Sequence, residues 1–469
     1  MSLFRPTADK FTQMTQTPIP RLVSTMAVPT IISMLITSLY NMADTFFVGR
    51  IGTSATAAVG VALPLMAVIQ AIGFTFGQGS GNHVSRLLGQ QKREEAQRMT
   101  VVAFYSAFLL GVVLGVLGLL FLDPLVNALG ATATSAQYTK DYVFYILIGA
   151  PFMVASLVLN NQFRFQGSAV FGMIGIFSGA VLNIILDPIF IFVLDLGTGG
   201  AALATILSQF VGFCLLVGGT FRGGNLRLSP AAFRPTLDRY RRILTGGLPS
   251  FWRQALASVA TVLLNVAARE YGDAAIAAMS IVSRITMFAG SALIGLGQGY
   301  QPVCGFNYGA KLYGRVREAY FFFFKAAAVA AVALAALGYV FAPQLMAIFR
   351  ADDLEVISIG TTALRMQCVS FPLMAWFFPS SMTLQTIGQS FRATVLAMCR
   401  QGLFFLPAIL ILPNVLGITG IQLSQPFSDL CSFLVASESS GSSRPPNWGR
   451  RPGKADFSGT FSSHLRQKV

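Results

Sequence analysis

The chain has 469 residues, of which 54% are hydrophobic and only 11% are charged, and its mean hydropathy is +0.65. An average soluble domain has about 25% charged residues, so this composition excludes a water-soluble globular surface. A net charge of +15 would indicate a nucleic-acid partner in a soluble protein, but here the charges fall in short loops and in the C-terminal segment, so no nucleic acid is expected as a partner.

Long apolar blocks dominate the rest of the chain. A helix needs roughly 20 apolar residues to cross a bilayer, and such blocks occur six times on each side of an arginine-rich segment. We therefore predict an all-α integral membrane protein with twelve transmembrane helices. The predicted helices cover residues 22–48, 54–82, 99–122, 137–163, 168–194, 198–219, 243–268, 274–304, 318–343, 356–386, 393–412 and 415–436.

Lysine and arginine are distributed unequally between the two sides of this layout. Of the 33 in the chain, 24 fall on the side of the two termini. The opposite loops hold five, namely Arg50, Lys140, Arg269, Arg350 and Arg365. Because cytoplasmic loops carry the excess of positive charge, both termini are expected in the cytoplasm.

The two halves of the chain repeat each other at an offset of 220 residues. The tripeptide Gly77-Gln78-Gly79 returns as Gly297-Gln298-Gly299. Further pairs at this offset are Gly52 with Gly272, Gly89 with Gly309, Gly197 with Gly417, Gly200 with Gly420 and Leu203 with Leu423. Six helices return each half to the side where it began, so the repeats are parallel, about an axis along the membrane normal.

This repeat predicts the domain organisation. Two parallel-repeat bundles of six helices can rock against each other around a cavity between them. The polar C-terminal segment is rich in Ser, Gly, Pro and Arg, which predicts a disordered cytoplasmic tail. The predicted boundaries are 1–220 for the N-terminal bundle, 221–242 for a cytoplasmic connector, 243–436 for the C-terminal bundle and 437–469 for the tail.

Two acidic residues lie inside predicted helices of the first half, where a carboxylate is costly and usually functional. Tyr40 and Asn41 precede Asp44 by four and three residues and share its helix face, and Asn183 precedes Asp187 by one helical turn. Pro188 has no N–H, so a backbone carbonyl one turn earlier is left bare. Such oxygens suit a sodium ion at Asp44, Asn183 and Asp187, or equally a carboxyl group that takes up a proton.

Other interpretations of these acids stay open at this point. Asp44 is near the outer end of its block, where it could be interfacial or pair with Arg50, and Asp187 could also lie near the outer surface. The positions that correspond to the two acids in the second half are Leu264 and Pro407. Because neither is acidic, we predict an ion site in the first bundle only.

Four more polar residues lie inside predicted helices and are candidates for the cavity wall, together with Asn41. Gln78 and Gln298 stand in Gly-rich segments, where close helix packing is the simpler interpretation. Arg284 and Arg400 could line the cavity or bind lipid. No catalytic grouping, metal-ligand spacing or Walker A pattern occurs, so no enzyme activity, resident metal or cofactor is expected.

Three stretches resemble the multidrug and toxic compound extrusion (MATE) family. They are YNMADTFFVGR at 40–50, NIILDPIFIF at 183–192 and Gln425-Pro426. The similarity runs from about residue 15 to 435, and the acidic residues resemble the prokaryotic branch related to the DNA-damage-inducible F protein. The resemblance implies a monomer in the bacterial inner membrane, in contact with lipid, that expels organic cations and other drugs in exchange for protons or sodium ions.

The resemblance also implies which residues act. It places the cation at Asp44 and Asp187 in the N-terminal bundle, with Tyr40, Asn160, Asn183 and Thr205 as neighbours. The alternative function is a lipid-linked oligosaccharide flippase of the same superfamily, which should have a cationic cavity for diphosphate. The two acids argue against a flippase, whereas Arg284 and Arg400 leave it open.

Overall fold

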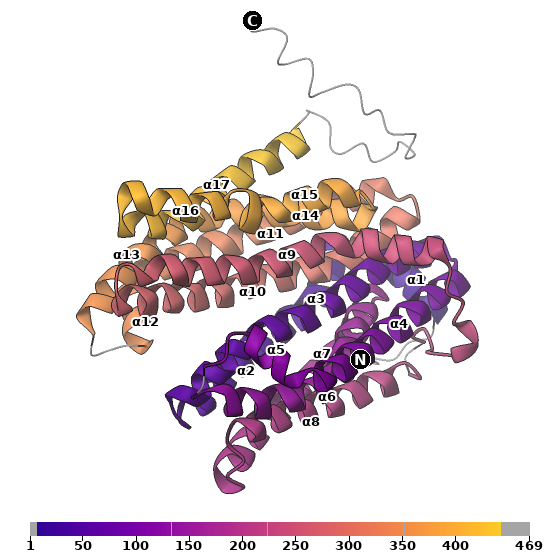
Figure 1. The fold of residues 1–469 in the computed structure, drawn as a ribbon. Helices are drawn as coiled ribbons and strands as arrows, with labels where there is room; N and C mark the ends of the chain where they lie inside the picture. Colours follow the sequence, from indigo (N-terminus) through magenta and orange to yellow (C-terminus); the bar gives the residue numbers. More distant parts are fainter. Residues whose placement is uncertain (1–6, 133, 223, 350–352, 442–469) are drawn as a thin grey trace, which may run out of the picture.

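The computed structural model describes residues 7–132, 134–222, 224–349 and 353–441, and within these ranges every regular element is a helix (Figure 1). The predicted tail is outside them from residue 442 onward. The elements of the first half are α1 (Thr7–Gln16), α2 (Ile19–Gly49), α3 (Thr53–Gly89), α4 (Arg93–Leu120), α5 (Leu122–Ala128), α6 (Ala136–Phe165), α7 (Ala169–Pro188), η1 (Ile189–Val193) and α8 (Gly197–Gly219).

The second half follows a connector with one short turn, η2 (Pro230–Ala232). Its elements are α9 (Leu237–Arg269), α10 (Asp273–Gly309), α11 (Tyr313–Val340), α12 (Ala342–Phe349), α13 (Leu354–Ser370), η3 (Phe371–Leu373), α14 (Met374–Ile387), α15 (Ser390–Met398), η4 (Cys399–Leu403), α16 (Phe405–Leu416) and α17 (Ile418–Gly441). The last helix continues past the predicted end at residue 436 to Gly441.

Each predicted transmembrane segment corresponds to one long helix or to a helix interrupted once. Ten of them satisfy length and hydropathy criteria for crossing a membrane, and the other two are 354–387 and 418–441. The interruptions have local causes. A π-helical turn, η1, follows Pro188, and the 3₁₀ turn η3 contains Pro372, because proline removes a backbone donor from the helical ladder.

The helices form two lobes with separate apolar cores. One core gathers buried side chains from Val48 to Ile243, and the other gathers them mainly from Ala260 to Ala436, with residues of α1 and α2 added. In Figure 1 the lobe of α2 to α8 and the lobe of α9 to α17 converge near α1 and diverge toward α12. The molecule is therefore V-shaped, with its closed end beside α1.

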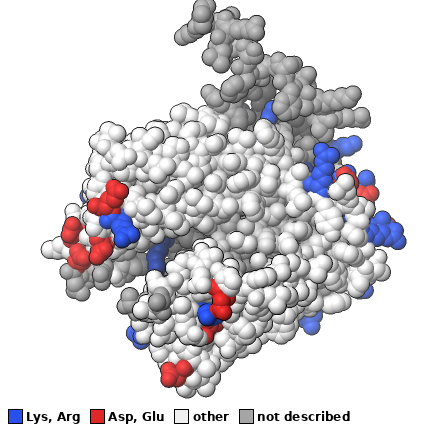
Figure 2. All heavy atoms as spheres, viewed as in Figure 1, with Lys and Arg blue, Asp and Glu red and all other residues white. Residues whose placement is uncertain are grey.

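The outer surface suits a lipid environment. Large apolar side chains such as Val329, Val415 and Leu120 are more than two-thirds exposed, at 72%, 73% and 71%. In Figure 2 charged groups gather at the two ends of the visible face and a broad uncharged belt separates them, with lysine and arginine dominant at the end near α1. An exposed apolar surface of this extent marks membrane contact in a protein with so few charges.

Glycines close the V at its narrow end. Gly79 of α3 packs against the backbone of α9 at Ile243 and Gly247, and Gly299 of α10 packs against the backbone of α2 at Ala27. These two contacts are equivalent in the repeat. At the offset of 220 residues, Gly79 corresponds to Gly299 and Ala27 corresponds to Gly247. Close approach of helix backbones needs residues without a side chain, so the repeated Gly-Gln-Gly motif is a packing motif in both halves.

A second pair of contacts follows the same symmetry. Gly89 lies against the carbonyl of Phe306, and Gly309 lies against the carbonyl of Arg86. The halves of α2, α3, α9 and α10 at the closed end of the V therefore pack together through glycines. We call the contacts of Gly79, Gly89, Gly299 and Gly309 the glycine seam. The seam holds the two lobes together with the parallel two-fold relation that the repeat predicted.

Replacement of Gly79 by alanine is expected to weaken this seam and to lower the thermal stability of the purified protein. Its Cβ would overlap the Ile243 carbonyl oxygen, which is backbone and cannot rotate away. Gly60→Ala on the same helix is the matched control, since a Cβ there meets nothing within 4 Å. Differential scanning fluorimetry in detergent measures both. Equal melting temperatures for the two variants would contradict a tight seam at Gly79.

Candidate functional site

A cavity of about 550 Å³ lies between the lobes. Its walls come from α2, α3, α6, α7 and α8 on one side and from α9, α10, the 354–387 helix, the 390–416 helix and α17 on the other. This volume is in the range of sites for small organic molecules. The cavity is hollowed between the diverging ends of the lobes (Figure 2). Gln298 on its wall is next to Gly299 of the glycine seam, so the seam lies at the closed end of the cavity.

The first lobe places Asp187 in the last turn of α7, next to the cavity wall. The Asp187 side chain is wholly buried, and its Oδ1 accepts a hydrogen bond from Asn183 Nδ2 at 3.1 Å. The same amide nitrogen lies 3.3 Å from Thr205 Oγ1 of α8. Asn183 and Thr205 line the cavity themselves. The carboxylate thus lies one side chain behind the surface that a solute would contact.

Asp44 and Asp187 lie near each other in space, although 143 positions separate them in the sequence. They are near enough to interact electrostatically, and Tyr40 is near enough to interact with both. The hydroxyl of Tyr40 is also within hydrogen-bonding reach of Gln209 on α8. The predicted cluster of Tyr40, Asn183, Thr205 and the two acids is therefore one site, built by α2, α7 and α8.

This acid cluster has oxygens with no donor. Asp44 Oδ1, Asp187 Oδ2 and Asn183 Oδ1 are buried and accept no hydrogen bond from the described residues. No ion pair of the described residues involves either acid. Arg50, which the sequence offered as a local partner for Asp44, lies over the ring of Phe46 at 4.7 Å. Buried acceptors without donors are costly, and a proton or a hard cation would satisfy them.

The other predicted candidates fall into two groups. Of the cavity candidates, Asn41, Gln298 and Arg400 line the cavity. Asn160, which the resemblance placed beside the acids, also lines it. Gln78 and Arg284 are not on its wall, which corrects that part of the prediction. Gln78 is buried next to Gly79 of the seam, and Arg284 is exposed.

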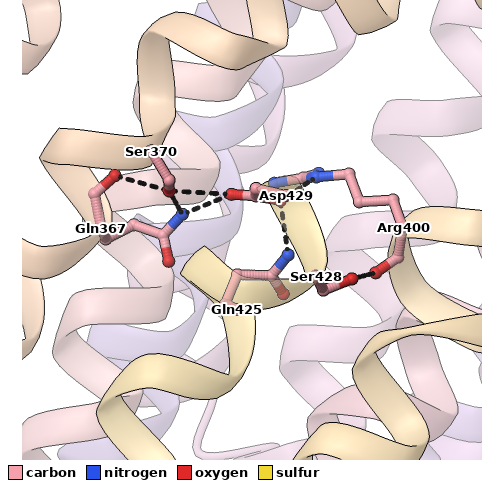
Figure 3. Close-up of polar contacts among 6 residues, drawn as sticks. All are labelled: Gln367, Ser370, Arg400, Gln425, Ser428 and Asp429. Carbon is pink, nitrogen blue, oxygen red and sulfur yellow. Dashed lines mark hydrogen bonds and ion pairs between the residues drawn. The ribbon is translucent and has the colours of Figure 1, made fainter. Parts of the chain in front are cut away.

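The second lobe holds an acidic residue that sequence reasoning missed. Asp429 of α17 is wholly buried and accepts four hydrogen bonds (Figure 3). Its Oδ1 binds Arg400 Nε at 2.9 Å and Gln425 Nε2 at 2.8 Å, and its Oδ2 binds Gln367 Nε2 at 2.8 Å and Ser370 Oγ at 3.1 Å. The second lobe therefore has its own buried carboxylate, but a paired and fully satisfied one.

The signal for Asp429 was present in the sequence. Asp429 lies inside the predicted helix 415–436, but it does not stand at the repeat position of either Asp44 or Asp187. In the repeat, Asp429 corresponds to Gln209 and Gln425 to Thr205. Of these four residues, Thr205, Gln209 and Gln425 line the cavity. The missing partner was Arg400, which the π-helical turn η4 presents to Asp429.

Two arginines are also placed differently from the prediction. Arg164 falls one residue beyond the predicted helix 137–163, but α6 continues to Phe165, so Arg164 is 3% exposed and lines the cavity. Its guanidinium donates to Gln298 of the opposite lobe and to Asn161. Arg253 lies inside the predicted helix 243–268 and also lines the cavity, from α9. Arg164 is placed differently because α6 extends past its apolar block, and Arg253 because the packing of α9 turns it toward the cavity.

Two helical lobes around a central cavity that is lined by apolar and polar side chains, with buried acids beside it and apolar outer faces, define an integral membrane transporter. The family model MatE matches residues 29–189 and 249–410, and the chain belongs to this family. It is therefore a multi-pass transporter and not an enzyme, and the predicted twelve-helix MATE-like fold is confirmed.

Characterised proteins similar to the chain agree with this assignment. It is 28% identical to the multidrug export protein MepA of Staphylococcus haemolyticus, over 87% of this chain and 90% of that protein. It is 29% identical to MepA of Staphylococcus saprophyticus, over 87% and 91%.

Solved structures show the same fold. A MATE protein in complex with MaL6 superposes with a TM-score of 0.87 at 27% identity, covering 92% of this chain and 97% of that one. An outward-facing multidrug resistance MATE transporter of the MOP superfamily gives 0.86 at 27% identity, with the same coverage.

Proposed function

We propose that this chain is a secondary active multidrug exporter that exchanges protons or sodium ions for organic cations and other drugs. The curated relatives that carry the name multidrug export protein support the cargo, and the bias of lysine and arginine supports a cytoplasmic location of both termini in the bacterial inner membrane. Each chain encloses its own cavity between its two lobes, which supports action as a monomer.

One observation carries the proposal of ion coupling. Asp44 and Asp187 lie together, without a basic partner among the described residues, behind cavity-lining Asn183 and Thr205. Without a proton or metal cation bound, the pair attracts a positively charged drug in a medium of low dielectric constant. With a proton or sodium ion bound, that attraction is lost. Ion and drug therefore compete for one negative site, which is the requirement for exchange.

The shape of the molecule supports outward release of the drug. With both termini in the cytoplasm, the V opens to the outside, so external ions reach the acid pair. Neutralisation of the carboxylates changes the acceptors available to Asn183 and the packing at the Pro188 interruption of α7. The drug is then released outward. For the protein to open to the cytoplasm again, the lobes must part at the glycine seam and close at the opposite end, as parallel bundles can do by rocking.

Transport in proteoliposomes tests this function. A proton gradient and a sodium gradient are imposed separately on vesicles that contain the purified chain, and the movement of a fluorescent organic cation is followed. At least one gradient is expected to drive the cation against its concentration, while an ionophore that dissipates that gradient abolishes the movement. Failure of both gradients to drive several chemically different cations would contradict ion-coupled drug export.

A lipid-linked oligosaccharide flippase remains the second candidate, and one observation favours it. Arg164 and Arg253 line the cavity, and a diphosphate would need such groups. Arg284 no longer supports it, because it is off the cavity, and Arg400 is paired with Asp429. Transport of a lipid-linked diphosphate rather than of small cations in the same vesicles would establish this alternative.

A further inference from the structure

The arginines around the cavity differ in how their charge is balanced. Arg400 has a counter-ion, since its Nε lies 2.9 Å from Oδ1 of the fully buried Asp429 (Figure 3). Arg164 and Arg253 have none, because no ion pair of the described residues includes either side chain. The same cavity thus contains one neutralised arginine and two that carry net positive charge.

The guanidinium group of Arg164 is held by two hydrogen bonds, but one of its nitrogens has no acceptor in the described part of the chain. Two guanidinium nitrogens donate to the amide oxygens of Gln298 and Asn161, whereas its buried Nε has no acceptor among the described residues. The side chain is 97% shielded from solvent and yet lines the cavity. Neutral amides orient this guanidinium and leave its charge uncompensated.

Arg253 brings a second positive charge to the same place. It projects from α9 of the opposite lobe, lines the cavity and is close enough to Arg164 for the two charges to interact. No hydrogen bond or ion pair within the described residues engages its guanidinium. Next to it, Gln254 Nε2 donates to Gln70 Oε1 across the lobes at 3.1 Å. Two like charges at the closed end of a cavity in the membrane repel each other, and an anion between them would relieve that repulsion.

We infer that the Arg164–Arg253 pair is a binding site for an anionic group of the transported molecule, a carboxylate or a phosphate. This inference rests on the proposed drug export and defines its substrates more narrowly. The acid cluster of the first lobe attracts a positive group, and the arginine pair attracts a negative one. Molecules that carry both charges fit this cavity better than simple cations do. Arginine is suited to this role, since its planar donors match carboxylate and phosphate oxygens.

A matched pair of dyes tests the inference. Rhodamine B has a free carboxylate and a cationic xanthene, and its methyl ester has one added methyl group in place of the negative charge. Binding to the purified protein is measured by fluorescence anisotropy without any gradient. The wild type is expected to bind the free acid about tenfold more tightly than the ester, since a hydrogen-bonded charge contributes on this order.

Variants assign the preference to the arginines. Arg253→Gln is expected to remove the tenfold preference and Arg253→Lys to retain part of it, while Arg284→Gln, an exposed arginine of α10, should leave it unchanged. Melting temperatures of all three confirm that each is folded. No preference in the wild type, or the same preference in Arg253→Gln and Arg284→Gln, overturns the inference.

The source of the anion is resolved by lipid composition. The measurement is repeated in nanodiscs of phosphatidylcholine alone and of phosphatidylcholine with phosphatidylglycerol. Equal preference in both supports a site for the substrate, whereas a preference abolished by phosphatidylglycerol shows that the pair binds an acidic headgroup and overturns it. Transport separates the two proposals: ester export without acid preference refutes only this site, and preserved preference without transport of either dye refutes only the proposed function.

Discussion

Asp187→Asn is expected to abolish ion-driven efflux in proteoliposomes while the protein remains folded. Asparagine keeps the shape of the side chain and can still hydrogen-bond Asn183, but it neither binds a proton nor carries a charge. Without a group whose charge the ion can change, ion and drug have no differential effect on each other and the coupling disappears. Asp44→Asn is expected to have the same effect, because its carboxylate belongs to the same cluster.

Drug affinity should fall as well, by roughly tenfold to a hundredfold, since an interaction with a charged group contributes about 1.5–3 kcal/mol. Uptake and release of a fluorescent cation are followed under the gradient that drives the wild type. Asp273→Asn, an exposed acid at the start of α10, is the control and should transport normally. Gradient-driven efflux at the wild-type rate in either Asp44→Asn or Asp187→Asn would refute the acid cluster as the coupling site.

The second large effect is expected at the Arg400–Asp429 pair. Arg400→Gln leaves a wholly buried carboxylate without its cation, and removal of one partner of a buried pair costs several kcal/mol. Arg400 is 24% exposed and three other donors to Asp429 remain, so a loss of about 2 kcal/mol is expected. Asp429→Asn should cost less, because the freed guanidinium can reach water in the cavity.

The double variant separates pairing from general damage. Arg400→Gln with Asp429→Asn removes both charges, so it should be more stable than Arg400→Gln alone. Thermal unfolding of the four proteins in detergent gives the coupling energy of the cycle. Strictly additive losses would show that the pair contributes nothing beyond its two separate environments. Coupling of efflux to the ion gradient should survive in all four, in contrast to the Asp187 variant.

Much of the fold could be predicted from the chain alone. All twelve long helices were predicted, because the length of an apolar block and the position of its charges are local properties that a bilayer selects directly. The repeat predicted a parallel two-fold relation, and the paired contacts of Gly79 with α9 and of Gly299 with α2 show it in the structure. The interruption of a helix at Pro188 was likewise readable, since proline lacks a donor wherever it stands.

The candidate site was predicted only in part. Asp44 and Asp187 were identified because a carboxylate inside an apolar block is costly in any fold. The role of Arg164 was missed because α6 extends two residues past the predicted end at 163, and the role of Arg253 was missed because only helix packing decides which arginine inside a helix lies at a cavity. Gln78 was a cavity candidate with close helix packing as the simpler interpretation, and its burial next to Gly79 of the seam agrees with packing.

By itself, the sequence determined which segments leave water and which of them carry a charge into the membrane, since each helix must satisfy the bilayer along its own length. Only the tertiary structure decided which charges meet. Asp429 is neutralised by an arginine from another helix, whereas Asp44 and Asp187 meet without a cation and Arg164 meets Arg253 without an anion. Whether a charge is paired depends on the distances between side chains of different helices. Charges at such distances interact strongly because the dielectric constant inside the protein is low.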